Sequence, residues 1–400
     1  MSALAANRVT HQTMHHALAE KMAHIVAAEP ALAADPAALA RRIRVEAGVI
    51  SDVDVLAIMR QLRNDTTGLG VLEAVLAQPG VTDVVVNGPD QVFFDRGQGL
   101  ERASVRFADA AEVRRLATRL AVAAGARLDD AQPFADGRLT RPDGAAIRIH
   151  ALLSPPAVGA PCLSLRVLRQ SQTSLEALVT NGTVPEDIAA LLRGLVAHQV
   201  SFLIIGGTGS GKTTLLSALL GQVAASQRII VIEDTTELAP DHPHVVSLVA
   251  RRANAEGSGE ISLSLLLRQA LRMRPDRIVV GEIRGAEVVD LLAALNTGHE
   301  GGAGTLHANS LQEVPARVEA LAAVGGMDRA SAHSQLAAAV RVVLAMRRRS
   351  DGTRELAQIG LLEPTPGQQQ VCAQVVWDST HGRREGFAQL LALVGCEEEQ

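Results

Sequence analysis

Residues 206–213, GGTGSGKT, form the strongest chemical pattern in the chain. They fit the spacing Gly-x-x-x-x-Gly-Lys-Thr, they follow an apolar run at 202–205, and a segment of helical character begins near Thr214. Glycines let backbone N–H groups converge on phosphate oxygens at the positive end of the following helix. The pattern therefore predicts a cradle for nucleotide phosphates rather than a chance glycine-rich turn.

The residue types within this cradle predict individual contacts. Lys212, one of only two lysines in the chain, supplies an ammonium group for the β- and γ-phosphates. The Thr213 hydroxyl is predicted to bind Mg²⁺. The predicted nucleotide-binding residues are Gly206, Gly207, Thr208, Gly209, Ser210, Gly211, Lys212, Thr213 and Thr214.

Two further apolar runs end in carboxylates. Residues 230–232 lead to Glu233 and Asp234, and residues 278–280 lead to Gly281 and Glu282. Because α/β sheets bind ligands at the carboxyl ends of their strands, these acids are predicted to position water or metal, with turn capping as the alternative. The second run resembles a Walker B strand in which a glycine stands at the usual Asp position. Glu282 is therefore predicted to act on the Mg²⁺ shell or on the attacking water, and Glu233 is a second catalytic candidate.

Two histidines lie among glycines in residues 297–309, TGHEGGAGTLHAN. This composition predicts a loop that senses the γ-phosphate, with His307 as its catalytic candidate. A metal pair is an alternative, although no cysteine lies nearby and the spacing is not HExxH. Histidines that are merely buried in the core are the other alternative.

Composition limits the classes of protein to consider. Hydrophobic residues make up 47% and charged residues 20%, as in globular proteins. Aromatic residues make up 2% and the net charge is -5, which disfavours a base-stacking platform or a coat on nucleic acid. Three distant cysteines indicate neither a zinc knuckle nor a disulfide framework, so a reducing, intracellular setting is expected. Apolar runs of about 18 residues are absent from the sequence, so a membrane role is expected to act through partners.

Periodicity divides the chain into three predicted parts. Residues 1–65 have apolar positions three or four apart, which predicts a helical bundle, with Asp35 and Pro36 at a helix start. Residues 66–170 predict an α+β domain, and residues 171–400 an α/β domain with a parallel sheet. The strands predicted in this last domain are 202–205, 229–232 and 278–280, followed by antiparallel edge strands at 342–346, 358–362 and 371–377 and a final helix near 387–394.

The order of the motifs at 206–213, 233–237, 281–282 and 297–309 resembles that of the secretion traffic ATPases of type II and type IV secretion and type IV pilus systems. The segments VNGPD at 86–90 and ALRMRPDR at 270–277 are most similar to the CpaF-like ATPases of tight-adherence (Flp) pilus assembly. The pilus extension and type II branches commonly carry a four-cysteine zinc module, which this sequence lacks.

The resemblance implies a RecA-like P-loop domain that hydrolyses ATP with Mg²⁺ in a hexameric ring. It implies a cytoplasmic protein at the inner face of the cytoplasmic membrane, held by inner-membrane platform proteins of a pilus or secretion system. Direct contact with nucleic acid is not expected, because the net charge is -5 and aromatic residues are few. Such enzymes complete their site with arginines of the preceding domain. The candidates are Arg138, Arg141, Arg148 and Arg166, of which Arg148 and Arg166 are favoured because they lie on predicted strands near the domain junction. For each of them, a surface ion pair is the alternative.

Two other functions fit the same motifs. A DNA-handling motor for conjugation or competence shares the RecA-like core, although the acidic net charge disfavours it. A regulatory module that binds ATP with little turnover is permitted by the glycine at the Walker B Asp position.

Overall fold

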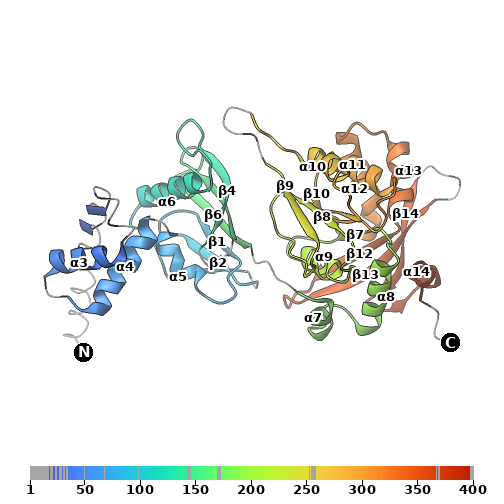
Figure 1. The fold of residues 1–400 in the computed structure, drawn as a ribbon, viewed down its shortest axis with the longest axis horizontal. Helices are drawn as coiled ribbons and strands as arrows, with labels where there is room; N and C mark the ends of the chain where they lie inside the picture. The colour runs from blue at the N-terminus through green and yellow to red at the C-terminus, as the bar shows by residue number, and fades with distance from the viewer. Residues whose placement is uncertain are drawn as a thin grey trace. The chain divides into compact units, whose positions relative to one another are not determined.

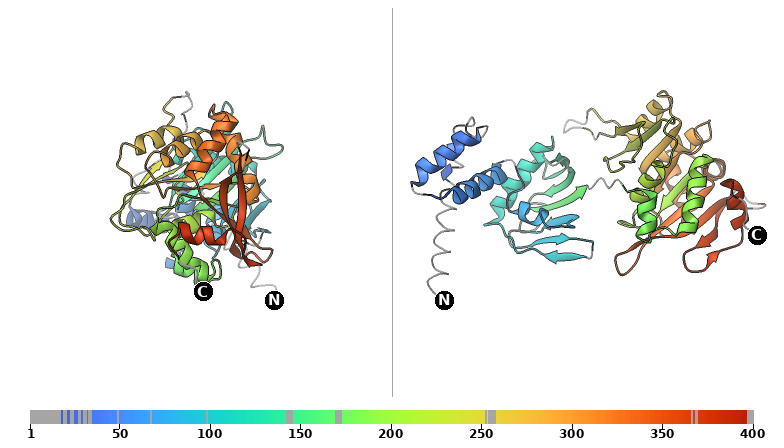
Figure 2. Two further views of the ribbon diagram at one scale, coloured as in Figure 1. Left: turned by 90° about the vertical axis from the view of Figure 1, so that its right-hand side faces the viewer. Right: turned by 60° about the horizontal axis from the view of Figure 1, so that its bottom comes forward.

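The computed structural model describes residues 35–48, 50–66, 68–97, 99–141, 146–168, 173–251, 258–365 and 370–396, and the single positions 18, 21, 22, 25, 26, 29, 32, 253 and 367. The chain divides into two compact units, Met1–Leu168 and Arg169–Gln400, shown in Figure 1 and Figure 2. The domain boundary expected at residues 170 and 171 lies outside the described residues, as does most of the expected bundle before residue 35.

Two helices, α3 (Pro36–Ala47) and α4 (Asp52–Thr66), begin the continuously described part of the first unit. The predicted start at Pro36 is confirmed, because the Asp35 side chain accepts hydrogen bonds from the N–H groups of Ala37 and Ala38. Ile43 and Ile58 are buried between the two helices, so the pair is held together by its apolar faces.

A six-stranded antiparallel sheet in the order β3-β2-β1-β6-β5-β4 forms the rest of the described first unit. Its elements are η1 (Gly70–Leu72), α5 (Glu73–Leu76), β1 (Asp83–Val86), β2 (Val92–Asp95), β3 (Leu100–Arg102), α6 (Ala110–Ala123), β4 (Phe134–Thr140), β5 (Ala146–Leu152) and β6 (Cys162–Leu168). Helix α6 packs on one face, where Ile147 and Ile149 are fully buried. Because strand side chains alternate, Arg148 belongs to the opposite face.

The described part of the second unit is built on a nine-stranded sheet in the order β15-β14-β13-β12-β7-β11-β10-β8-β9. Strands β12, β7, β11, β10, β8 and β9 run parallel, and β13 to β15 complete the sheet as antiparallel strands. Their bounds are β7 (Phe202–Ile205), β8 (Ile229–Glu233), β9 (Val245–Val249), β10 (Arg277–Ile283), β11 (Ala303–Leu306), β12 (Val342–Arg348), β13 (Arg354–Pro364), β14 (Val371–Asp378) and β15 (Gly382–Arg383).

Helices cover both faces of this sheet (Figure 1). They are α7 (Leu175–Thr180), α8 (Glu186–Ala197), α9 (Lys212–Leu220), α10 (Leu263–Ala270), α11 (Glu287–Leu295), η2 (Leu311–Glu313), α12 (Val314–Val324), α13 (Arg329–Ala339) and α14 (Phe387–Leu393). Helices α7, α8, α9 and α14 contribute to one apolar core and α10 to α13 to the other. Consecutive residues of β8 alternate between the two cores, as expected for a strand buried on both faces.

The structure corrects one prediction for this sheet and adds three strands. Residues 342–346 were predicted to form an antiparallel edge strand, but β12 lies inside the sheet and runs parallel to β7. Its first five residues are all buried, which is typical of an interior strand. The additional strands are β9, β11 and the two-residue β15. Strand β11 has the sequence AGTL, whose Ala and Gly give little strand propensity.

Among the described residues, helices with the length and hydropathy needed to cross a membrane are absent.

Candidate active site

The predicted chemical groups of the second unit meet at one edge of its sheet. Residues 206–213 follow β7, His307 follows β11, Glu282 lies near the end of β10, and Glu233 ends β8. These four strands are parallel neighbours in the order β7-β11-β10-β8. Their carboxyl ends therefore bring segments up to about a hundred residues apart to the same crevice, where α/β sheets bind ligands.

Residues 206–211 form the loop between β7 and α9, referred to below as the P-loop. Gly206, Gly209 and Gly211 have φ angles of 145°, 71° and 96°, a backbone that only glycine adopts without strain. The Lys212 ammonium donates to the carbonyl oxygens of Gly206 at 2.9 Å and Gly207 at 3.0 Å. Burial lowers its pKa below the ordinary value, and the negative charge of Glu282 opposes this shift. A partly desolvated cation whose hydrogen bonds go to neutral carbonyl groups is suited to an anion, so the loop fits a phosphate chain.

Neighbouring strands also leave no room for side chains at two glycines of the P-loop. An ideal Cβ on Gly206 would overlap the Met346 carbonyl oxygen of β12, and one on Gly211 would lie 3.1 Å from Cδ of Arg354 in β13. Arg354 Nε donates to the Gly209 carbonyl at 3.0 Å. The hairpin of β12 and β13 therefore lies directly against the loop. Met346 and Arg354 were not among the site residues predicted from the sequence. The run Arg347-Arg348-Arg349 in the same hairpin was an available signal for this segment.

Glu282 is held by an arginine two residues further along the chain. Its carboxylate accepts a hydrogen bond from Arg284, whose other terminal nitrogen lies 3.7 Å from Asp234 Oδ2. The bond to Glu282 raises the pKa of Arg284 above its ordinary value. The side chain of Glu282 is 33% exposed, so a ligand can reach it. Arg284 therefore bridges the two acidic segments and orients Glu282.

Glu233 has different surroundings, because it is 4% exposed. Its Oε1 accepts hydrogen bonds from the N–H groups of Glu237 at 3.1 Å and Leu238 at 3.0 Å. A Cβ on Gly281 would lie 2.6 Å from the Cγ of Glu233. The glycine at the Walker B Asp position thus makes room for Glu233, and this acid fastens the loop that follows β8.

The two histidines differ in exposure. His307 is exposed directly after β11, whereas His299 is half-buried with Nδ1 3.3 Å from the Ala294 carbonyl oxygen. The Thr305 hydroxyl, buried in β11, donates to the Gly281 carbonyl of β10 at 2.6 Å. The part of the chain that the structure describes holds no group of three His, Cys, Asp or Glu side chains placed to bind a metal.

Thr213 and Glu282 are the residues that could hold Mg²⁺ at this edge. Thr213 follows Lys212 in the first turn of α9 and is half-buried. Mg²⁺ at nucleotide sites takes most of its ligands from phosphates and water rather than from a protein cage. One hydroxyl and one carboxylate beside a phosphate cradle therefore fit this ion.

A pocket of about 400 Å³ opens beside the P-loop. Gly211 and Thr214 line it from the loop and α9, Met346 and Arg354 from the hairpin, and Asn181 and Thr183 from the segment after α7. Apolar and polar groups thus line a space that adjoins the predicted phosphate positions, as in sites for small ligands.

Arg148 and Arg166 lie in the first unit, on the face of its sheet opposite α6. Cross-strand pairing puts Arg138, Arg148 and Arg166 side by side on β4, β5 and β6. Arg166 Nε donates to Asp83 Oδ1 at 2.9 Å and is 53% exposed. Like charges directly opposite one another are unfavourable in a sheet, so this row of three arginines favours an anionic ligand.

Comparison with known proteins identifies the family. Residues 65–393 match the family described as type II/IV secretion system protein. A Mycobacterium tuberculosis protein named for conjugal transfer is 56% identical over 344 residues, which cover 86% of this chain and 97% of that protein. The conjugal transfer protein TrbB of Rhizobium radiobacter is 34% identical over 247 residues, 61% of this chain and 72% of that protein.

A solved structure confirms the predicted fold class. The Legionella pneumophila ATPase DotB superposes with a TM-score of 0.52 at 20% identity, over 75% of this chain and 81% of that chain. The chain belongs to the type II/IV secretion system protein family and has the RecA-like fold of the secretion ATPases.

Proposed function

We propose that this protein hydrolyses ATP and uses the energy to drive a membrane-embedded secretion or pilus machine. The observation that carries the proposal is the P-loop, in which the partly buried Lys212 donates to the carbonyls of Gly206 and Gly207 while Glu282 lies at the same sheet edge. Family membership over residues 65–393 supports it.

Each residue has a distinct task in this proposal. Lys212 and the loop N–H groups bind the phosphates, and the pocket beside Thr214 takes the nucleoside. Thr213 and Glu282 hold Mg²⁺, which neutralises charge on the phosphates when bound. Glu282, oriented by Arg284, positions the attacking water. His307, exposed at the end of the neighbouring strand, reports the state of the γ-phosphate.

The test of nucleotide chemistry uses the two lysines of the chain. Lys212→Ala is expected to abolish ATP hydrolysis without changing the circular dichroism spectrum. Lys21→Ala is the matched control, because Lys21 is 60% exposed and pairs with Glu46 in the first unit. Full turnover in Lys212→Ala would refute the phosphate role. Turnover that persists in Glu282→Gln would refute the role of Glu282. If the unsubstituted protein binds ATP without hydrolysing it, a regulatory module would be favoured instead.

Arg148 and Arg166 are proposed to neutralise charge that develops on the γ-phosphoryl group. Their place in a row of like charges supports contact with an anion. An arginine that stabilises this transition state contributes roughly 10³-fold or more to the rate. Arg148→Ala and Arg166→Ala should each lower kcat strongly, whereas Arg96→Ala, which removes a surface pair with Glu101, should not. Parent-like kcat in both variants would refute the proposal.

The machine proposed first is Flp pilus assembly, on the similarity of residues 86–90 and 270–277 to CpaF-like ATPases. A conjugation motor is the second candidate, because the M. tuberculosis relative at 56% identity is named for conjugal transfer. Salt-sensitive binding to DNA would favour conjugation. Pilin and platform genes beside this one would favour the pilus.

Assembly and location complete the proposal. The protein is proposed to form a hexameric ring at the cytoplasmic face of the inner membrane, attached to platform proteins of the machine. Multi-angle light scattering with ATP and Mg²⁺ is expected to give a mass six times that of the chain. A monomer under these conditions would contradict the ring.

A further inference from the structure

The β12–β13 hairpin holds a side chain against the P-loop that belongs to none of the four motifs. Arg354 Nε donates to the Gly209 carbonyl at 3.0 Å, across 145 residues of sequence. The same side chain borders the pocket beside Gly211 and Thr214. From this geometry we propose that Arg354 is a positioning residue for the nucleotide phosphates, acting through the Gly209–Ser210 peptide; this inference rests on the proposed function.

The geometry of the peptide bond gives the physical reason. In a trans peptide the carbonyl oxygen of Gly209 and the N–H of Ser210 point in opposite directions. Arg354 holds the carbonyl on the β13 side, and the Ser210 N–H is turned toward the Gly207 carbonyl at 3.4 Å. Lys212 donates to this same oxygen at 3.0 Å. Two donors thus converge on the Gly207 carbonyl oxygen, and a bound phosphate oxygen would accept from both donors instead.

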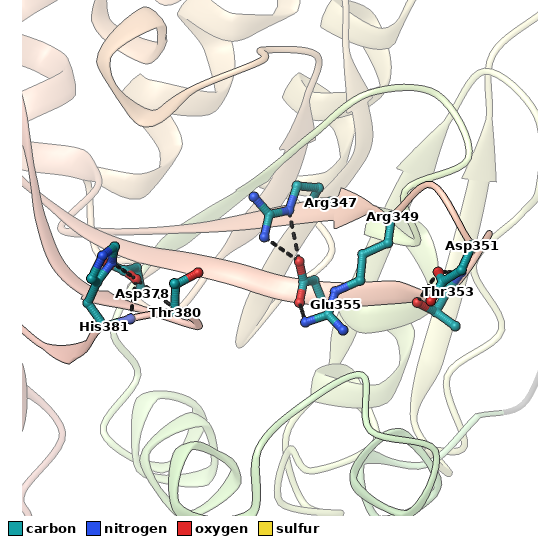
Figure 3. Close-up of polar contacts among 8 residues, drawn as sticks. All are labelled: Arg347, Arg349, Asp351, Thr353, Glu355, Asp378, Thr380 and His381. Carbon is teal, nitrogen blue, oxygen red and sulfur yellow. Dashed lines mark hydrogen bonds and ion pairs between the residues drawn. The ribbon is translucent and has the colours of Figure 1, made fainter.

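Residues on both sides of Arg354 in the sequence make polar contacts that order the hairpin, and Figure 3 shows those of Asp351 with Thr353 and of Glu355 with two arginines. The Asp351 side chain accepts hydrogen bonds from the backbone N–H of Thr353 at 2.9 Å and from its hydroxyl at 2.6 Å, which closes the turn. Glu355, 4% exposed, is bound by Arg347 and Arg349. Arg354 precedes Glu355 on β13, so the two side chains alternate and Arg354 is directed at the P-loop instead.

Loss of this bond should weaken the binding of every ligand that uses the P-loop. A hydrogen bond from a charged donor contributes enough for a change in affinity of about tenfold. Arg354→Ala is therefore expected to raise the Kd of a fluorescent ADP analogue and the KM for ATP by about tenfold. Because Arg354 holds the P-loop in the same way in the ATP-bound state and in the transition state, kcat at saturating ATP should change less than about threefold. Arg354→Lys keeps one charged donor and should recover most of the affinity.

Inorganic tripolyphosphate separates action through the loop from contact with the nucleoside. Measured by displacement of the fluorescent ADP analogue, its affinity should fall in Arg354→Ala by the same factor as that of ADP. Unchanged tripolyphosphate affinity beside weakened ADP binding would overturn the role through Gly209, as would parent-like binding of both. Arg193→Ala is the matched control, since Arg193 is 45% exposed and pairs with Glu176 in the same unit.

Two further measurements keep the result specific. The melting temperature of Arg354→Ala should match that of the parent, because this side chain is exposed. A lower melting temperature, together with no recovery of nucleotide affinity in Arg354→Lys, would assign Arg354 a structural role and overturn the proposal. Lys212→Ala distinguishes the two proposals. If it loses ADP binding while Arg354→Ala does not, only the role of Arg354 fails; if Lys212→Ala binds ADP like the parent, the proposed function fails.

Discussion

Gly281→Ala tests how the Walker B segment is packed. The new Cβ would lie 2.6 Å from Cγ and 2.9 Å from Oε1 of Glu233, well inside ordinary contact distance. Glu233 cannot yield without cost, because its Oε1 accepts from two N–H groups and its side chain is buried. Overpacking costs about 1–3 kcal/mol, and a weakened bond to a charged acceptor costs about 1.5–3 kcal/mol. Gly281→Ala should therefore lower the free energy of unfolding by about 3 kcal/mol.

A double-mutant cycle isolates this contact. Glu233→Ala leaves the N–H groups of Glu237 and Leu238 without their acceptor, at a cost of about 3 kcal/mol. In the double variant the overlap is gone, so its stability should equal that of Glu233→Ala alone rather than fall by the sum of both changes. The free energies come from urea unfolding followed by fluorescence of Trp377, the single tryptophan of the chain, which is buried in β14.

Two results would refute this account of the glycine. One is a Gly281→Ala variant whose free energy of unfolding is within about 0.5 kcal/mol of the parent, the range of ordinary surface substitutions. The other is additivity of the two changes, because independent sites add and contacting sites do not. Either result would mean that Gly281 does not make room for Glu233.

Three further substitutions test other parts of the second unit. Arg277→Met removes a 2% exposed guanidinium that donates to three oxygens at 2.7 to 3.1 Å, so urea unfolding should show a loss of about 3 kcal/mol or more. Arg284→Ala removes the group that orients Glu282, so steady-state kinetics should show kcat lowered roughly tenfold with little change in KM. Burial raises the pKa of Glu355, but the bonds from its two arginines outweigh this and lower it below 4.5. A depressed pKa stabilises the fold above the unfolded-state value, so the stability gap between the parent and Glu355→Gln should be full near pH 7 and shrink as the pH falls through 4.5.

The motif segments could be predicted because each is contiguous in sequence. The strands predicted at 202–205, 229–232 and 278–280 correspond to β7, β8 and β10, and the glycines and acids lie at their carboxyl ends or directly after them. Local hydrophobicity and residue type determine such features. The helix start at Pro36 belongs to the same class, since one capping side chain specifies it.

The remainder depends on which strands are neighbours, and local patterns do not contain this information. The packing of Gly281 against Glu233 requires β10 and β8 to be adjacent, and the bond from Arg354 to Gly209 requires β13 to lie near the P-loop. Strand β12 shows the same limit, because its apolar run is compatible with an edge or an interior position. Tertiary pairing decides between the two.

Sheet order also ranks the candidate catalytic groups in a way that sequence order does not. In sequence, Glu233 is nearer to Lys212 than Glu282 or His307 is, but the strands are arranged β7-β11-β10-β8. At about 4.8 Å per strand, His307 is one step from the P-loop strand, Glu282 is two steps or about 10 Å away, and Glu233 is three steps or about 14 Å away. A carboxylate acting near the γ-phosphate is therefore more easily supplied by Glu282, and the buried position of Glu233 matches a role in fastening the loop that carries Asp234. On this argument, Glu282→Gln should lower kcat at unchanged stability, whereas Glu233→Gln should lower stability first.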